Sequence, residues 1–133
     1  MPLALVKRMT YINSFKDLTV WQVSMNLADV CFDIVEAIPH PYRFTFTDQV
    51  IPAGISIPSN IAEGSRRPTK AYLNHLSYSL GSHGELETLF EIIHRRKLVP
   101  DALLTKGVCL IDPVGKMLHG LRESLEARLC FDT

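Results

Sequence analysis

Hydrophobic side chains recur with alternating spacings of three and four residues in several stretches of this chain. Residues 17–37 carry two such rows, one through Leu18, Trp21, Met25 and Phe32 and one through Val20, Val23, Leu27 and Ile34. At roughly 100° per residue, the two rows cover about 220° of a helix, whereas a surface helix of a monomer needs a stripe about half as wide. We therefore expect a helix that starts at Asp17 as N-cap and is covered both by its own bundle and by another subunit. The candidate oligomer interface consists of Val20, Trp21, Val23 and Leu27.

The second periodic stretch, residues 47–63, contains two prolines. Pro52 falls in the first turn, where a missing N–H costs least, but Pro58 lies inside the run. A proline crowds the carbonyl four residues earlier, and Gly54 stands there without a Cβ. We predict a helix that is kinked at Pro58 and stopped by a left-handed Gly64, with Thr69 as N-cap of the next helix.

The third and fourth stretches predict two more helical regions. In residues 69–97, the leucines before and after Gly81-Ser82-His83-Gly84 lie near opposite faces, which indicates a bend or a close helix crossing at the glycines. The fourth region is expected in two pieces, Asp101–Ile111 and a helix opened by Asp112 as N-cap and Pro113 at its first position. No segment reads as a convincing strand. The pattern predicts an all-α protein, a four-helix bundle.

The length of 133 residues suits one domain. We assign the bundle to residues 15–130 and expect residues 1–14 to form a poorly ordered N-terminal extension, with Met9 as an alternative start to Met1. The three cysteines form no CxxC pair, which favours a reducing compartment. No signal peptide or membrane span is apparent, so a cytoplasmic location is expected.

Four strings of residues bear a resemblance to a known family. They are Phe15-Lys16-Asp17-Leu18 with Val20-Trp21-Gln22, then residues 55–64, then Leu80-Gly81-Ser82 with residues 85–88, and finally residues 117–121. This resembles the four-helix bundle proteins encoded within intervening sequences of bacterial 23S ribosomal RNA genes, a family related to the accessory proteins of diversity-generating retroelements. The resemblance implies an antiparallel up-down bundle that assembles into a homopentamer. It also implies no known catalysis, and a role in binding RNA, DNA or a nucleic-acid enzyme.

The most specific string, residues 57–64, places polar side chains where a core helix would carry leucines. One interpretation is a polar site that reads a ligand or partner. The other, which we favour, is that Asn60 and Glu63 satisfy backbone groups left unpaired by the proline and the adjoining helix ends. The candidate structural motif consists of Pro58, Ser59, Asn60, Glu63 and Gly64.

Positive charge is clustered although the chain is neutral overall, with 14 basic and 14 acidic residues. Zero net charge argues against a strong non-specific grip on nucleic acid. A ring of subunits would nevertheless multiply a local patch, so Arg66, Arg67 and Lys70 are candidate contacts for nucleic acid or a partner. The competing interpretation is a solvated helix end. No aromatic residue is interleaved with the basic clusters in the sequence, which argues against stacking on single strands.

One metal-binding element can be considered, the Glu-x-x-His of Glu91 and His94. A di-iron bundle enzyme needs a second copy of this element and two further glutamates on facing helices, and the sequence has no second copy. We expect Glu91 and His94 on an exposed face and His83 at a helix crossing, with no cofactor. The leading hypothesis is a non-enzymatic, homo-oligomeric scaffold, and the alternative is a metal-dependent bundle enzyme.

Overall fold

The computed structural model describes residues 14–132, and nearly all of them are helical. A short 3₁₀ helix, η1 (Phe15–Asp17), precedes α2 (Thr19–Ala37), α3 (His40–Ser65), α4 (Thr69–Arg95) and α5 (Asp101–Asp132). No strand occurs among these residues, which confirms the all-α, four-helix prediction. Residues 1–13 lie outside the described part, and so does the predicted N-terminal extension apart from Ser14.

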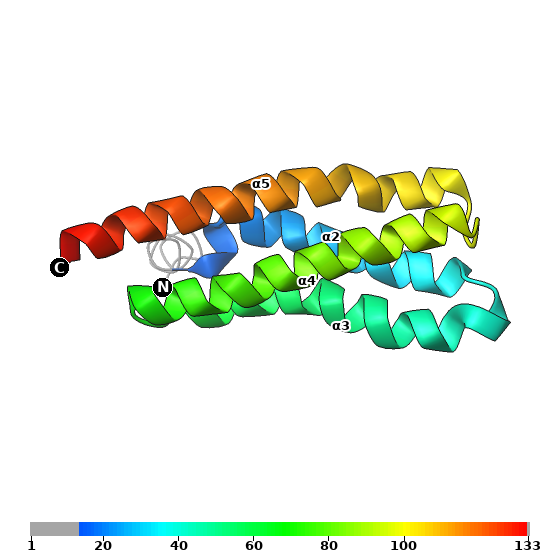
Figure 1. Cartoon of the computed structure of the whole chain (residues 1–133), viewed down its shortest axis with the longest axis horizontal. Helices are drawn as coiled ribbons and strands as arrows, with labels where there is room; N and C mark the ends of the chain where they lie inside the picture. The colour runs from blue at the N-terminus through cyan, green and yellow to red at the C-terminus, as the bar shows by residue number, and fades with distance from the viewer. Residues whose placement is uncertain (1–13, 133) are drawn as a thin grey trace, which may run out of the picture.

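The helices form a bundle in which consecutive helices pack together and α5 returns to pack against α2. In Figure 1 they lie along one long axis, and the chain reverses its direction at each connection. All four helices supply fully buried side chains to one core, among them Leu27, Ile57, Leu86 and Leu118. None of the helices described is both long and apolar enough to cross a membrane.

The starts of α2 and α3 differ from those expected. Asp17 ends η1, and the extended Leu18 occupies the N-cap position of α2, so the predicted cap at Asp17 is wrong. The helix expected over 47–63 begins at His40, because Pro41 lies in the first turn, where a helix tolerates a missing N–H. The Arg43 side chain also donates from Nε to the carbonyl of Ile38 at 3.0 Å, which ties this turn to the end of α2.

Gly64 does not stop α3 in a left-handed conformation. It lies inside the helix, and no glycine among the described residues has a positive φ. A Cβ at this position would lie 2.7 Å from Cδ1 of Tyr72 and 2.9 Å from Cβ of His75, so the glycine allows α4 to approach α3 closely. Thr69 is the first residue of α4 rather than its N-cap, a position that Pro68 occupies.

The buried face of α4 does not change sides. It follows one stripe of alternating three- and four-residue steps, in which only His83 is half-buried and the others are buried: Tyr72, Leu76, Ser79, His83, Leu86, Phe90 and Ile93. The two central positions of this stripe are the polar residues Ser79 and His83, so the hydrophobic pattern in the sequence is interrupted there. A Cβ at Gly81 or Gly84 would meet no atom within 4 Å, so the close crossing expected at these glycines is wrong.

The two predicted pieces of the fourth region form one helix, with Pro113 inside it. Ile111 and Val114 beside the proline are both buried in the core. Tertiary packing on both sides therefore holds the helix together where local preference would end it. Pro58 likewise lies inside the continuous α3, and the kink expected there stays a prediction.

Candidate interaction surface

The predicted oligomer residues divide between the core and the surface. Val20 and Leu27 are buried within their own bundle, with 6% and 0% of their surface exposed. Another subunit cannot reach them while the bundle is folded, so their assignment to an interface is wrong. Trp21 and Val23 are partly buried and pack against the edge of the core.

The hydrophobic row of α2 that includes Trp21, Met25 and Phe32 borders a groove between α2 and α3. The α2–α3 groove, as we call it, has a volume of about 420 Å³. Its walls include Met25 and Phe32 from α2 and Ile55 from α3, which are 37%, 45% and 44% exposed. Phe15 closes one end and meets Trp21 edge to face, with ring centroids 5.3 Å apart. These apolar side chains form a surface that no other residue in the described part of the chain covers.

The groove continues into a basic mouth at the end of α3. A second hollow of about 520 Å³ shares Phe15, Ser59 and Ala62 with the groove and adds Glu63, Arg66 and Arg67. The guanidinium carbon of Arg66 lies 5.5 Å from the centroid of the Phe15 ring, which is a cation–π arrangement. Neither arginine forms an ion pair with any side chain from 14 to 131. Lys70 is exposed on the first turn of α4.

Phe15 is the functional candidate that the sequence did not reveal. In the sequence, no aromatic residue is interleaved with the arginines, but the fold brings η1 against the end of α3. The basic cluster therefore does have an aromatic neighbour in space. Only long-range packing could show this, because the two residues belong to different elements.

Asn60 turns away from the groove toward α4. Its Nδ2 donates to the carbonyl and the hydroxyl of Ser56, at 2.9 and 3.1 Å. Its Oδ1 lies 3.0 Å from Nδ1 of His75 and, being a carbonyl oxygen, accepts a hydrogen bond from the N–H of that ring. Asn60 therefore binds the carbonyl of Ser56. It does not bind the carbonyl of Gly54, which lacks a helical donor because Pro58 has no N–H.

Serine hydroxyls extend this network across the two helices. Ser79 donates to the carbonyl of Ile57, and Ser82 donates to the hydroxyl of Ser56, both at 2.9 Å. We call Ser56, Asn60, His75, Ser79 and Ser82 the α3–α4 polar layer. Because its groups bind one another, the layer joins two helices rather than offering donors to a ligand.

The remaining residues of the candidate motif take different positions. Pro58 and Gly64 are buried, whereas Ser59 and Glu63 are exposed and line the groove and its mouth. The Glu63 carboxylate lies 4.0 Å from Nδ1 of His75, at the edge of the polar layer. The motif therefore contributes residues both to the α3–α4 polar layer and to the α2–α3 groove.

The histidines singled out in the sequence lie on α4. Nε2 of His83 is 2.6 Å from the carbonyl of Ile111 on α5, so His83 lies where α4 packs against α5. Glu91 and His94 are exposed, as expected, and Glu91 is paired with Arg95 at 3.0 Å. Across the described ranges, no three side chains of His, Cys, Asp or Glu gather closely enough to hold a metal ion.

Comparison with known protein families identifies a match for most of the chain. No curated protein matches the chain. A family model described as "23S rRNA-intervening sequence protein" matches residues 16–120, a range that begins in η1 and ends in α5. The match spans the polar layer and, apart from Phe15, the residues of the groove and the basic mouth.

Proposed function

Because this chain belongs to the family of 23S rRNA-intervening sequence proteins, we propose that it is a non-enzymatic, homo-oligomeric scaffold. Its subunits associate through the α2–α3 groove, and the basic mouth contacts RNA, DNA or a nucleic-acid enzyme in the cytoplasm. The family resemblance supports a ring of five subunits. The observation that carries the proposal is the row of exposed apolar side chains along the groove.

The groove has the chemistry of a protein interface. Met25, Phe32 and Ile55 come from two helices and line one continuous hollow, so their exposure is not scattered. Monomeric proteins rarely leave large contiguous apolar patches in water, and such patches mark interaction sites. Aromatic residues and methionine are also the residue types enriched in the cores of interfaces.

The oligomer is tested by light scattering coupled to size-exclusion chromatography. Phe32→Glu and Ile55→Glu place a charge in the groove and are expected to yield folded monomers. Phe44→Glu is the matched control, since Phe44 is 78% exposed on α3 outside the groove and should leave the oligomer intact. A stable monomer of the unaltered protein at micromolar concentration would refute the proposal.

Nucleic-acid contact is tested by a salt titration. Arg66 and Arg67 lie at the mouth, where no described side chain forms an ion pair with them, and an assembled ring would repeat them around its rim. We expect binding at low salt that weakens steeply as salt is added, since phosphate binding releases counterions. Arg66→Ala with Arg67→Ala should reduce affinity and slope, whereas Lys116→Ala, which removes a lysine paired with Asp112 on α5, should not. Absence of binding at low salt would contradict this part.

The non-enzymatic part is tested by elemental analysis. Glu91 and His94 are the metal-binding element of the alternative bundle enzyme, but Glu91 is engaged by Arg95 and both side chains face solvent. We expect no stoichiometric metal after purification from metal-rich medium. Stoichiometric iron or manganese would favour the enzyme instead.

A further inference from the structure

The stretch of chain that opens α4 contains no acidic residue. Residues 66–84 include two arginines and one lysine but neither aspartate nor glutamate, and this run ends at Glu85. Its exposed positions hold only arginine, lysine, proline, asparagine, serine, glycine and one tyrosine. That tyrosine, Tyr78, is 57% exposed. A basic surface that displays an aromatic ring is the combination with which proteins bind single nucleic-acid strands.

The Tyr78 ring is supported on one side and open on the other. His75, one turn earlier, meets it edge to face, with ring centroids 6.4 Å apart and planes at 72°. The His75 ring is itself fixed by its 3.0 Å hydrogen bond to Asn60 in the α3–α4 polar layer. One turn later, a Cβ at Gly81 would meet no atom within 4 Å. Since helical side chains lean toward the N-terminus, a large side chain at position 81 would lie against the ring, and glycine leaves that space clear.

Resting on the proposed contact with nucleic acid, we infer that Tyr78 is a stacking platform for a base of single-stranded RNA or DNA. Lys70, Asn74 and Tyr78 recur at four-residue steps and are all exposed, so they form one stripe along α4. Tyr78 lies about 12 Å along the helix from Lys70, a distance that about three to four stacked nucleotides cover. Lys70 and the two arginines of the mouth hold phosphates of the strand whose base stacks on Tyr78.

A single strand suits this surface better than a duplex does. In a duplex the bases are stacked on one another, so no base face is available to Tyr78. Stacking also accepts any base, because every base has a π-face. The spacing of basic and aromatic residues in the sequence argued against stacking, since Tyr78 follows Lys70 only about two helical turns later. The surface therefore recognises the single-stranded state and not a particular sequence.

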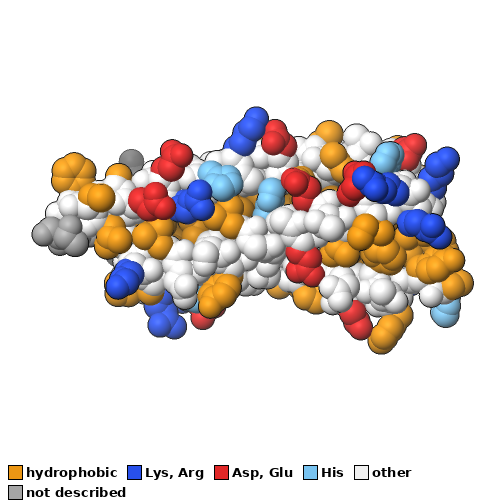
Figure 2. Space-filling model, viewed as in Figure 1, with side chains coloured by type: hydrophobic (Ala, Val, Ile, Leu, Met, Phe, Trp, Pro, Cys, Tyr) orange, Lys and Arg blue, Asp and Glu red, His pale blue; other side chains and the backbone are white. Residues whose placement is uncertain are grey.

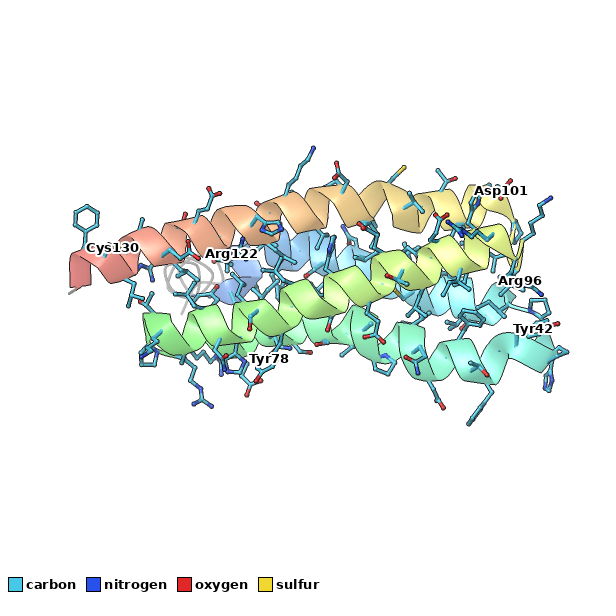
Figure 3. All side chains as sticks on the ribbon, viewed as in Figure 1. Tyr42, Tyr78, Arg96, Asp101, Arg122 and Cys130 are labelled. Carbon is cyan, nitrogen blue, oxygen red and sulfur yellow. The ribbon has the colours of Figure 1, made fainter. Side chains whose placement is uncertain are left out.

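Fluorescence anisotropy with labelled oligouridylate, oligothymidylate and a DNA duplex of equal length tests the platform. Tyr78→Ala should weaken single-strand binding about five- to hundredfold, the loss of one base–aromatic stack, and Tyr78→Phe should restore it. Duplex affinity and the salt slope should stay unchanged, because the phosphate contacts remain. Tyr42→Ala is the matched control, since Tyr42 is 50% exposed and lies in the opposite half of the bundle (Figure 3). The oligomer that the unaltered protein binds more tightly distinguishes RNA from DNA as the ligand.

A substitution at Gly81 tests the platform without removing its ring. Gly81→Leu should weaken single-strand binding while the fold becomes no less stable, because leucine favours a helix more than glycine does. Gly84→Leu is the matched control, since a Cβ there also meets no atom within 4 Å but position 84 faces away from Tyr78. Weakening by both leucines alike would contradict the platform.

The two proposals fail separately. If Tyr78→Ala binds single strands as tightly as the unaltered protein, while Arg66→Ala with Arg67→Ala weakens binding, the stacking platform fails and the proposed contact with nucleic acid stands. If the unaltered protein binds none of the three probes at low salt, both fail.

Discussion

Two glycines inside helices of this protein have opposite surroundings. A Cβ at Gly54 would lie 2.9 Å from Sγ of Cys31, a contact closer than real Cβ atoms make. A Cβ at Gly84 would meet nothing within 4 Å. Gly54 thus permits the close packing of α3 on α2, whereas Gly84 only weakens the preference of α4 for a helix.

We expect Gly54→Ala to lower the free energy of unfolding by about 1–3 kcal/mol, the usual cost of overpacking a core. Gly84→Ala is the matched control and should raise it by up to about 1 kcal/mol through helix propensity. Urea denaturation followed by circular dichroism measures both. Equal effects of the two substitutions would contradict the close packing at Gly54.

The buried thiol of Cys31 has a pKa raised from 9.0 to about 12, because burial disfavours the thiolate. In the unfolded chain the thiol ionises at its ordinary pKa, so this group's contribution to stability is lost as pH rises from about 9 toward 12. At pH 8 we expect a thiol reagent to modify the exposed Cys109 and Cys130 quickly and Cys31 only on unfolding. Rapid modification of all three thiols in native protein would contradict the burial of Cys31.

At the scale of the helices, the number, order and class of elements could be predicted from hydrophobic spacing alone. The predicted helix boundaries and the predicted buried face of α4 were wrong where tertiary packing outweighs local preference. Pro113 reads as a helix start, yet the buried Ile111 and Val114 carry α5 through it. The stripe of α4 reads as broken because Ser79 and His83 are polar, and only their bonds to α3 and α5 explain why they lie inward.

The α3–α4 polar layer makes Asn60 a joint between two helices. Asn60→Ala leaves the Nδ1 donor of His75 and the hydroxyl of Ser56 without this partner. We expect a loss of about 1–3 kcal/mol in the free energy of unfolding, the cost of leaving partly buried polar groups unsatisfied. Asn74→Ala, at an exposed position of α4, should change it by less than about 0.5 kcal/mol. A loss no larger for Asn60 than for Asn74, measured by denaturant titration, would contradict the joint.

At the scale of the whole molecule, acidic and basic side chains are equal in number and are not separated into two regions on the face shown in Figure 2. Figure 2 shows acidic and basic side chains interspersed over the visible face, as expected for 14 charges of each sign. Sequence could therefore point to Arg66 and Arg67 as a local cluster. It could not reveal the groove beside them, because Phe15, Phe32 and Ile55 meet only after three elements have packed.

If subunits associate through the groove, thermal stability depends on protein concentration. Association stabilises the folded state by mass action, so Tm should rise as the concentration is raised from about 1 to 100 μM. Phe32→Glu should abolish this dependence while leaving a cooperative transition. Differential scanning fluorimetry measures both, and a Tm of the unaltered protein that does not change with concentration would contradict association.

The packing of α5 against α2 also bears on the order in which this chain can fold during synthesis. A nascent chain emerges N-terminal end first, so α2, α3 and α4 leave the ribosome before α5 does. Ile34 of α2 is fully buried, and a Cβ at Gly107 of α5 would lie only 3.1 Å from its Cδ1. Until α5 has been made, that part of α2 lacks its contact with α5. The nascent protein is therefore expected to be most prone to aggregation just before its last helix appears.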